Sequence, residues 1–140
     1  MLKTVESFEQ EMQKANLKYH GLRDLEDGRT VCICGVSGLN TRYDVTVIFD
    51  ADERHIALRV FQLLKVPIDR MGQILELMNA LNHQFRWIKF TVDQDNDVSL
   101  QADAIVDSHT CGTVSVELLV RIMKIIDEAY PQFMKVIWAG

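Results

Sequence analysis

Cys111, His109 and Asp107 lie within one five-residue stretch and are the nearest approach to a catalytic set in this sequence. A thiolate nucleophile needs a neighbouring base or a positive helix end, and Cys111 precedes an expected helix. Residues two apart in a loop are not thereby aligned, and a chain with four histidines offers such groups by chance. A thiol-dependent enzyme using Cys111 and His109 therefore stays an alternative, and no catalytic residue is assigned.

A zinc site is the second chemistry that the residue types allow. Cys32 and Cys34 share one face of an expected strand, and with His109 and Cys111 they offer four soft ligands. No CxxC or HxxxH pair accompanies them. We therefore interpret the cysteines as buried, reduced thiols and expect no disulfide and no metal.

The spacing of Asp93, Asp95 and Asp97 matches the start of a calcium-binding loop. The match ends there, because Val98 occupies the position that needs glycine and Ala104 the position that needs a bidentate glutamate. The pattern predicts an acidic hairpin turn. The common phosphate-binding, hydrolase and metalloprotease motifs are also absent, so no cofactor is expected.

Charge and hydropathy exclude two classes of partner. The 140-residue chain carries a formal net charge of −5 and has no cluster of lysine and arginine, which argues against nucleic acid as a partner. No segment approaches the ~18 uninterrupted apolar residues of a membrane span. The first residues turn polar at once, unlike a signal peptide. We expect a single domain over residues 1–140 in the cytoplasm, with no membrane contact.

The periodicity of apolar residues predicts a twisted antiparallel sheet packed with helices, in the order αβββαββα and the α+β class. The expected elements are a helix over 4–16, strands over 31–36, 43–49 and 56–60, a helix over 71–82, strands over 88–92 and 98–104, and a helix over 115–130. Thr113 or Ser115 is expected to cap the last helix, and Pro131 to break or kink it.

The last helix is apolar around most of its circumference, and an apolar tail follows it. It could be a central core helix, or it could meet another chain. The second hypothesis assigns a homodimer or partner surface to seven residues: Met123, Ile126, Tyr130, Phe133, Met134, Ile137 and Trp138. The wetter face of the sheet adds four large side chains that one layer of helices could leave uncovered: Ile48, Phe61, Trp87 and Ile105.

Several segments resemble the YbjN family. They are LNHQF at 81–85, WIKF at 87–90, the acidic turn at 93–97, VSL at 98–100 and VSVELL at 114–119. Val98 departs from this pattern, in which glycine is common. The resemblance implies a bacterial cytoplasmic protein without known catalytic residues, described as a regulator of sensory transduction, with a fold like that of the dimeric type III secretion chaperones. It transfers no site residue to this chain.

These observations favour a non-enzymatic protein-interaction module, either chaperone-like or a regulatory adaptor, that works as a homodimer and binds a protein client. A small-ligand sensing domain is the main alternative.

Overall fold

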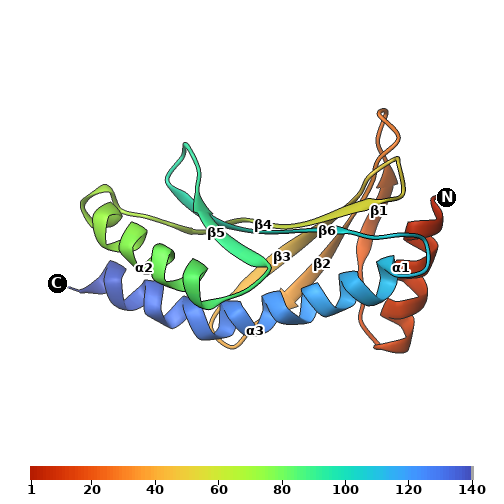
Figure 1. Ribbon diagram of the computed structural model, residues 1–140. Coiled ribbons are helices and arrows are strands. Elements are labelled where there is room, and N and C mark those ends of the chain that lie inside the picture. Colours follow the sequence, from red (N-terminus) through yellow and green to blue (C-terminus); the bar gives the residue numbers. More distant parts are fainter. Residues whose placement is uncertain (140) are drawn as a thin grey trace.

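The computed structural model describes residues 1–139 and has three helices on one face of an antiparallel sheet (Figure 1). Its elements are α1 (Lys3–Lys14), β1 (His20–Asp24), β2 (Thr30–Ser37), β3 (Arg42–Phe49), β4 (His55–Lys65), the short 3-10 helix η1 (Ile68–Arg70), α2 (Met71–Gln84), β5 (Ile88–Val92), β6 (Asp97–Ile105) and α3 (Cys111–Trp138). The predicted α+β class is confirmed.

The sheet has six strands in the order β1-β2-β3-β4-β6-β5. Tyr43, Val45, Val47 and Phe49 alternate inward along β3, as the sequence predicts, and all four are buried. Their neighbours continue the pattern across the sheet in one buried row, Cys32, Val47, Leu58, Ala102 and Ile88. The helices cover this row, and the opposite face of the sheet carries no helix (Figure 1).

One strand, β1, is absent from the expected order. It is short and mostly exposed, with Leu22 as its one half-buried apolar side chain, so it lacks the alternation that indicates a strand. A β-bulge interrupts its pairing with β2, where Gly21 has a φ of 67°. The observed order is therefore αββββαββα.

α3 begins at Cys111, four residues earlier than expected. Both predicted caps, Thr113 and Ser115, therefore lie inside the helix. Asp107 instead accepts hydrogen bonds from the backbone N–H groups of His109 and Thr110, both at 2.8 Å, and holds the loop before the helix. Gly112 in the first turn lies against the backbone of Ser7 in α1, where a Cβ atom would come within 2.2 Å of the Ser7 carbonyl oxygen. Only glycine permits this crossing of the two helices.

Pro131 does not end α3, which continues to Trp138. A proline inside a helix leaves the carbonyl four residues earlier without its helical partner, here that of Asp127. Asn40 in the β2–β3 turn donates a hydrogen bond of 3.3 Å to that carbonyl oxygen, and the backbone N–H of Leu39 donates to the Asp127 carboxylate at 2.9 Å. Beyond the proline, buried Phe133 packs on Phe90 with ring centroids 5.3 Å apart. These tertiary contacts outweigh the local cost of the proline.

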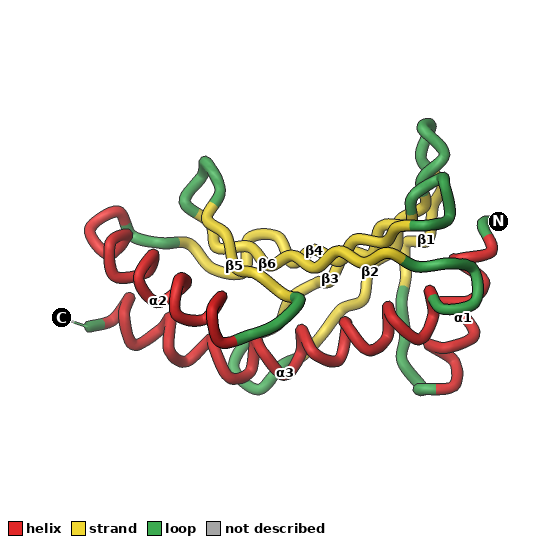
Figure 2. Tube along the Cα trace, viewed as in Figure 1, coloured by secondary structure: helices red, strands yellow, loops and turns green. Residues whose placement is uncertain are grey.

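Figure 2 shows hairpin loops that rise at both ends of the sheet, away from the helices. Within residues 1–139, no helix combines the length and the apolar composition needed to cross a bilayer.

Candidate protein-binding surfaces

The last three residues of β6 have no strand beside them on one side. β5 begins where Ile88 pairs with Ala102, so the segment from Asp103 to Ile105 extends past it. Trp87, the residue before β5, has a φ of 72°. This left-handed conformation turns the chain away from β6 and ends the pairing.

In the segment from Asp103 to Ile105, two residues point their backbone N–H and carbonyl groups toward the side of β6 that has no strand. Phe90 of β5 bonds through both its N–H and its carbonyl to the side chain of Asn82, at 2.7 and 3.0 Å, so its backbone faces away from β6. Its neighbour Lys89 therefore faces β6 and pairs with Gln101 there. Because backbone groups alternate along a strand, Asp103 and Ile105 also face the open side.

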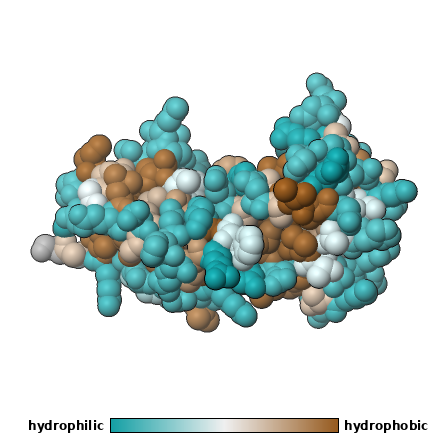
Figure 3. Space-filling model, viewed as in Figure 1, coloured by the Kyte–Doolittle hydropathy of each residue, from teal (hydrophilic) through white to brown (hydrophobic). Residues whose placement is uncertain are grey.

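A groove of about 810 Å³ surrounds this open edge. Its lining comes from both faces of β6, the start of β4, the first half of α3, and the residues Asp50 and Trp87. The apolar lining residues are Ile56, Ala57, Trp87, Ala104, Ile105, Val114 and Leu118, and the polar ones are Asp50, His55, Asp103, Glu117 and Arg121. In Figure 3 hydrophobic residues gather above the N-terminal half of α3. Trp87 and Ile105 are 64% and 82% exposed.

Most charged groups around the groove are paired. Arg121 bonds to Glu117 at 2.8 Å, and Arg59 bonds to Asp103 at the same distance. His55 bonds to Asp52 at 2.7 Å. Within residues 1–139 the Asp50 carboxylate has no hydrogen-bond or ion-pair partner, but it lies within 4.8 Å of the nearest ligand atoms of Asp52 and His55.

The C-terminal surface predicted from the sequence is smaller in the structure. Ile126 and Phe133 are buried in the core, because they face the sheet and β5, so they are not surface residues. Met123, Tyr130, Met134 and Ile137 are half-buried, and Trp138 is 80% exposed. Arg70 donates a hydrogen bond to the carbonyl of Ala139, which brings η1 and its exposed Ile68 to the same end of the molecule.

The thiol candidate is not arranged for nucleophilic chemistry. Cys111 is fully buried, and burial raises the pKa of its thiol to about 11 even though it contacts the Ser115 hydroxyl at 3.6 Å. His109 is exposed, and Asp107 is engaged by backbone N–H groups, which lower the pKa of its carboxyl. The thiol is therefore protonated near neutral pH, without a neighbouring base to activate it.

Cys32 and Cys34 are neighbours, but no three of the residues proposed as zinc ligands form one cluster among residues 1–139. Among residues 1–139, the three ligand atoms that lie within 4.8 Å of one another belong to Asp50, Asp52 and His55, none of which is in the predicted zinc set. Cys32, Cys34 and Cys111 are free, buried thiols.

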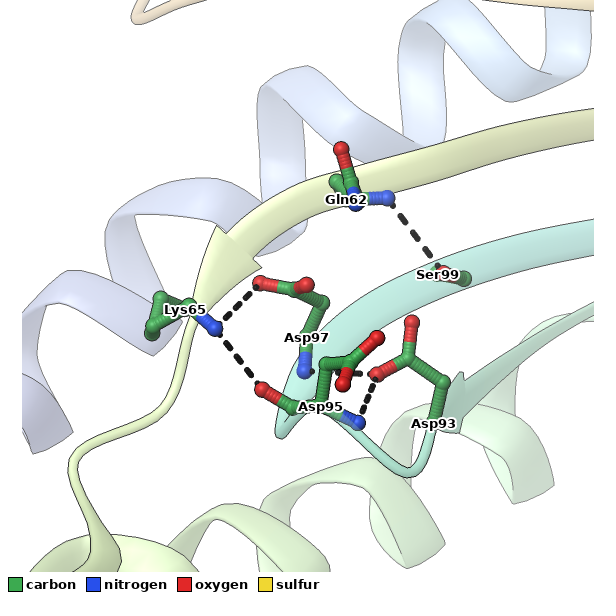
Figure 4. A network of polar contacts seen from close by, with 6 residues as sticks. All are labelled: Gln62, Lys65, Asp93, Asp95, Asp97 and Ser99. Atoms are coloured by element: carbon green, nitrogen blue, oxygen red, sulfur yellow. Dashed lines mark hydrogen bonds and ion pairs between the residues drawn. The ribbon is translucent and has the colours of Figure 1, made fainter.

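The acidic segment after β5 is a hairpin turn stabilised by its own side chains (Figure 4). The Asp93 carboxylate accepts the backbone N–H groups of Asp95 at 2.9 Å and Asp97 at 3.0 Å. The Lys65 ammonium donates to the Asp95 carbonyl at 2.7 Å and lies 3.5 Å from the Asp97 carboxylate. Lys65 of β4 thus offsets part of the negative charge of the turn.

Sequence reasoning found two of the groove residues, Trp87 and Ile105, as uncovered side chains on the sheet. It missed Ala104, Val114 and Leu118, which look like ordinary core positions. One signal was available: the run of alternating residues at 98–104 is longer than that at 88–92, so a hairpin of the two must leave one end of the longer strand unpaired.

Comparison with known proteins agrees with this architecture. A family model described as "YbjN: Putative bacterial sensory transduction regulator" matches residues 4–137. No curated protein sequence matches the chain.

Three solved structures share the fold. YbjN from E. coli, described as a putative transcription regulator, has a TM-score of 0.59 and 12% identity, over 91% of this chain and 92% of that one. A chain of the HopA1–SchA chaperone–effector complex has a TM-score of 0.53 and 15% identity, over 91% of this chain and 95% of that one. A chain of the ExsC–ExsE complex has a TM-score of 0.51 and 16% identity, over 90% of this chain and 92% of that one. With a family match across nearly its whole length, the chain belongs to the YbjN family.

Proposed function

We propose that this protein is a non-enzymatic interaction module that binds a segment of another protein in the groove beside β6, in the manner of a chaperone or a regulatory adaptor. The observation that carries this proposal is the groove itself, which is largely apolar, open to solvent and bounded by a helix and a strand edge. Apolar contact area with a few polar groups at its rim is typical of peptide recognition. The likeness in fold to a chaperone–effector complex supports it.

Peptide selection from a random display library tests the proposal. We expect enriched peptides to bind the wild-type protein but not the Ile105→Arg variant, because the arginine brings charge into the apolar edge of the groove. Leu39→Arg is the matched control, since Leu39 is 84% exposed and lies in the β2–β3 turn, outside the groove. Peptides that bind both variants equally, or no enrichment on the wild type, would refute a groove-based function.

Homodimerisation is the second part of the proposal, and it uses the end of α3 with η1. Exposed Trp138 and Ile68 and half-buried Ile137 leave apolar area there that a second copy could cover. Trp138→Ser with Ile137→Glu is expected to lower the mass in sedimentation equilibrium to that of a monomer, and Leu39→Ser to leave it unchanged. A monomeric wild type would refute this part alone.

Small-ligand sensing stays the alternative, because a volume of about 810 Å³ is within the range of small-molecule pockets. A metabolite that raises the melting temperature of the wild type but not of Ile105→Arg would favour it. A cytoplasmic location, in keeping with three free thiols, completes the proposal.

A further inference from the structure

We infer that the groove binds its partner as an added β-strand: an extended segment that pairs with Asp103 and Ile105 of β6, continues the line of β5 and carries basic residues, which suit a chain with a net charge of −5. This inference rests on the proposed function and specifies the conformation and the charge of the bound segment.

The pairing follows from the backbone. Asp103 and Ile105 each direct an N–H and a carbonyl to a side of β6 that has no strand, while Val106 returns to β4 through a bond of 2.8 Å from its N–H to the Arg54 carbonyl. An extended chain in this position satisfies both donors and both acceptors. A helix has no free backbone groups to offer them, because its own ladder uses them.

The outer edge of β5, in the same hairpin, is by contrast blocked against a further strand by a side chain. The Asn82 side chain donates to and accepts from the backbone of Phe90, which occupies the position that a further strand on β5 would need. An uncovered edge is a hazard that proteins usually block. At Asp103–Ile105 no side chain of residues 1–139 takes this role, and a turn at Trp87 keeps β5 away.

Charge selects among extended segments. Glu117 and Asp103 beside the edge already have arginine partners, and the chain as a whole carries −5. The net negative charge attracts a basic segment, whereas an acidic segment would be repelled. Side chains at alternate positions of the segment would face Val114 and Leu118 of α3 on one side.

The test uses three synthetic octapeptides and fluorescence anisotropy: one that alternates lysine and valine, one that alternates glutamate and valine, and a copy of the first with N-methyl groups on every second residue. We expect the lysine peptide to bind with a Kd of about 0.1 mM or tighter. We expect the other two to bind at least about tenfold more weakly, since one has the wrong charge and the other has lost the N–H donors along one edge of the strand.

Ile105→Pro removes one outward N–H from β6, at an edge position that tolerates proline, and is expected to weaken the lysine peptide by about five- to tenfold. Ile105→Val keeps the N–H and is the matched control. Circular dichroism checks that both variants fold. Binding that survives both N-methylation and Ile105→Pro, or no binding of the lysine peptide to the wild type, would overturn strand addition. If library-selected peptides still depend on the groove in that case, the proposed function stands without it.

Discussion

Trp87 offers a sharp test of the structure, because it is a bulky residue in a left-handed conformation. About a third of its side chain is covered, so removal of the ring exposes on the order of 80 Å² and costs about 2 kcal/mol of unfolding free energy. In Trp87→Ala the backbone strain at a φ of 72° remains. Trp87→Gly relieves that strain, which stabilises the folded state by about 1–2 kcal/mol. The extra freedom of glycine in the unfolded chain costs about 0.5–1 kcal/mol of this gain.

We therefore expect Trp87→Gly to be more stable than Trp87→Ala by about 0.5–1 kcal/mol, the reverse of the order at an ordinary strand position. Urea unfolding followed by circular dichroism measures the difference in midpoint. Thr91 in β5 is the matched control, because it is exposed and its φ is not positive; there the glycine variant should be the less stable one. An alanine variant at 87 as stable as the glycine variant would refute the conformation that leaves the β6 edge open.

The same pair of variants separates binding from stability. Both remove the indole ring from the wall of the groove, so both should lose affinity for groove-binding peptides to the same extent even though their stabilities differ. A loss of affinity that follows stability instead would mean that Trp87 acts through folding rather than contact.

Three further predictions test contacts within the fold. Gly112→Ala should lose about 3 kcal/mol or more of unfolding free energy because its Cβ meets Ser7, whereas Gly72→Ala in α2, with open space around it, should gain about 0.5–1 kcal/mol; thermal melts check both. Asn82→Ala should cost about 2 kcal/mol, as it leaves the backbone groups of Phe90 without partners, and it should promote aggregation measurable by light scattering. The raised pKa of Cys111 stabilises the fold below pH 9, and that contribution should be lost as pH rises from 9 toward about 11; urea midpoints of Cys111→Ala should lack this slope.

The sequence was most informative where one face of an element is buried. Two periodic sets predicted the inward faces of the first two long helices: Val5, Phe8, Met12 and Ala15, and Met71, Ile74, Leu75, Met78 and Leu81. Six of these nine are buried, whereas Ala15 and Leu75 are exposed and Met71 is half-buried. These patterns depend only on period and burial, which a sequence carries locally. The fold class therefore followed from them.

The groove could not be predicted in the same way, because it depends on register and on one backbone angle. Nothing local to Trp87 indicates a positive φ, which asparagine or glycine would have suggested. Likewise, the neighbours of Cys111 in sequence left a thiol nucleophile open as an alternative, whereas its burial in three dimensions raises the pKa of the thiol. Pairing partners and burial depth are long-range properties, and they decided both outcomes.

The contact between the β2–β3 turn and α3 has a consequence for the order of folding. A peptide of α3 alone would lose helical continuity at Pro131, since no internal donor reaches the Asp127 carbonyl. That donor comes from Asn40, 87 residues earlier. The C-terminal turns of α3 should therefore become helical late, after the hairpin has docked, and they should be the first part of the helix to exchange its amide hydrogens in the native state.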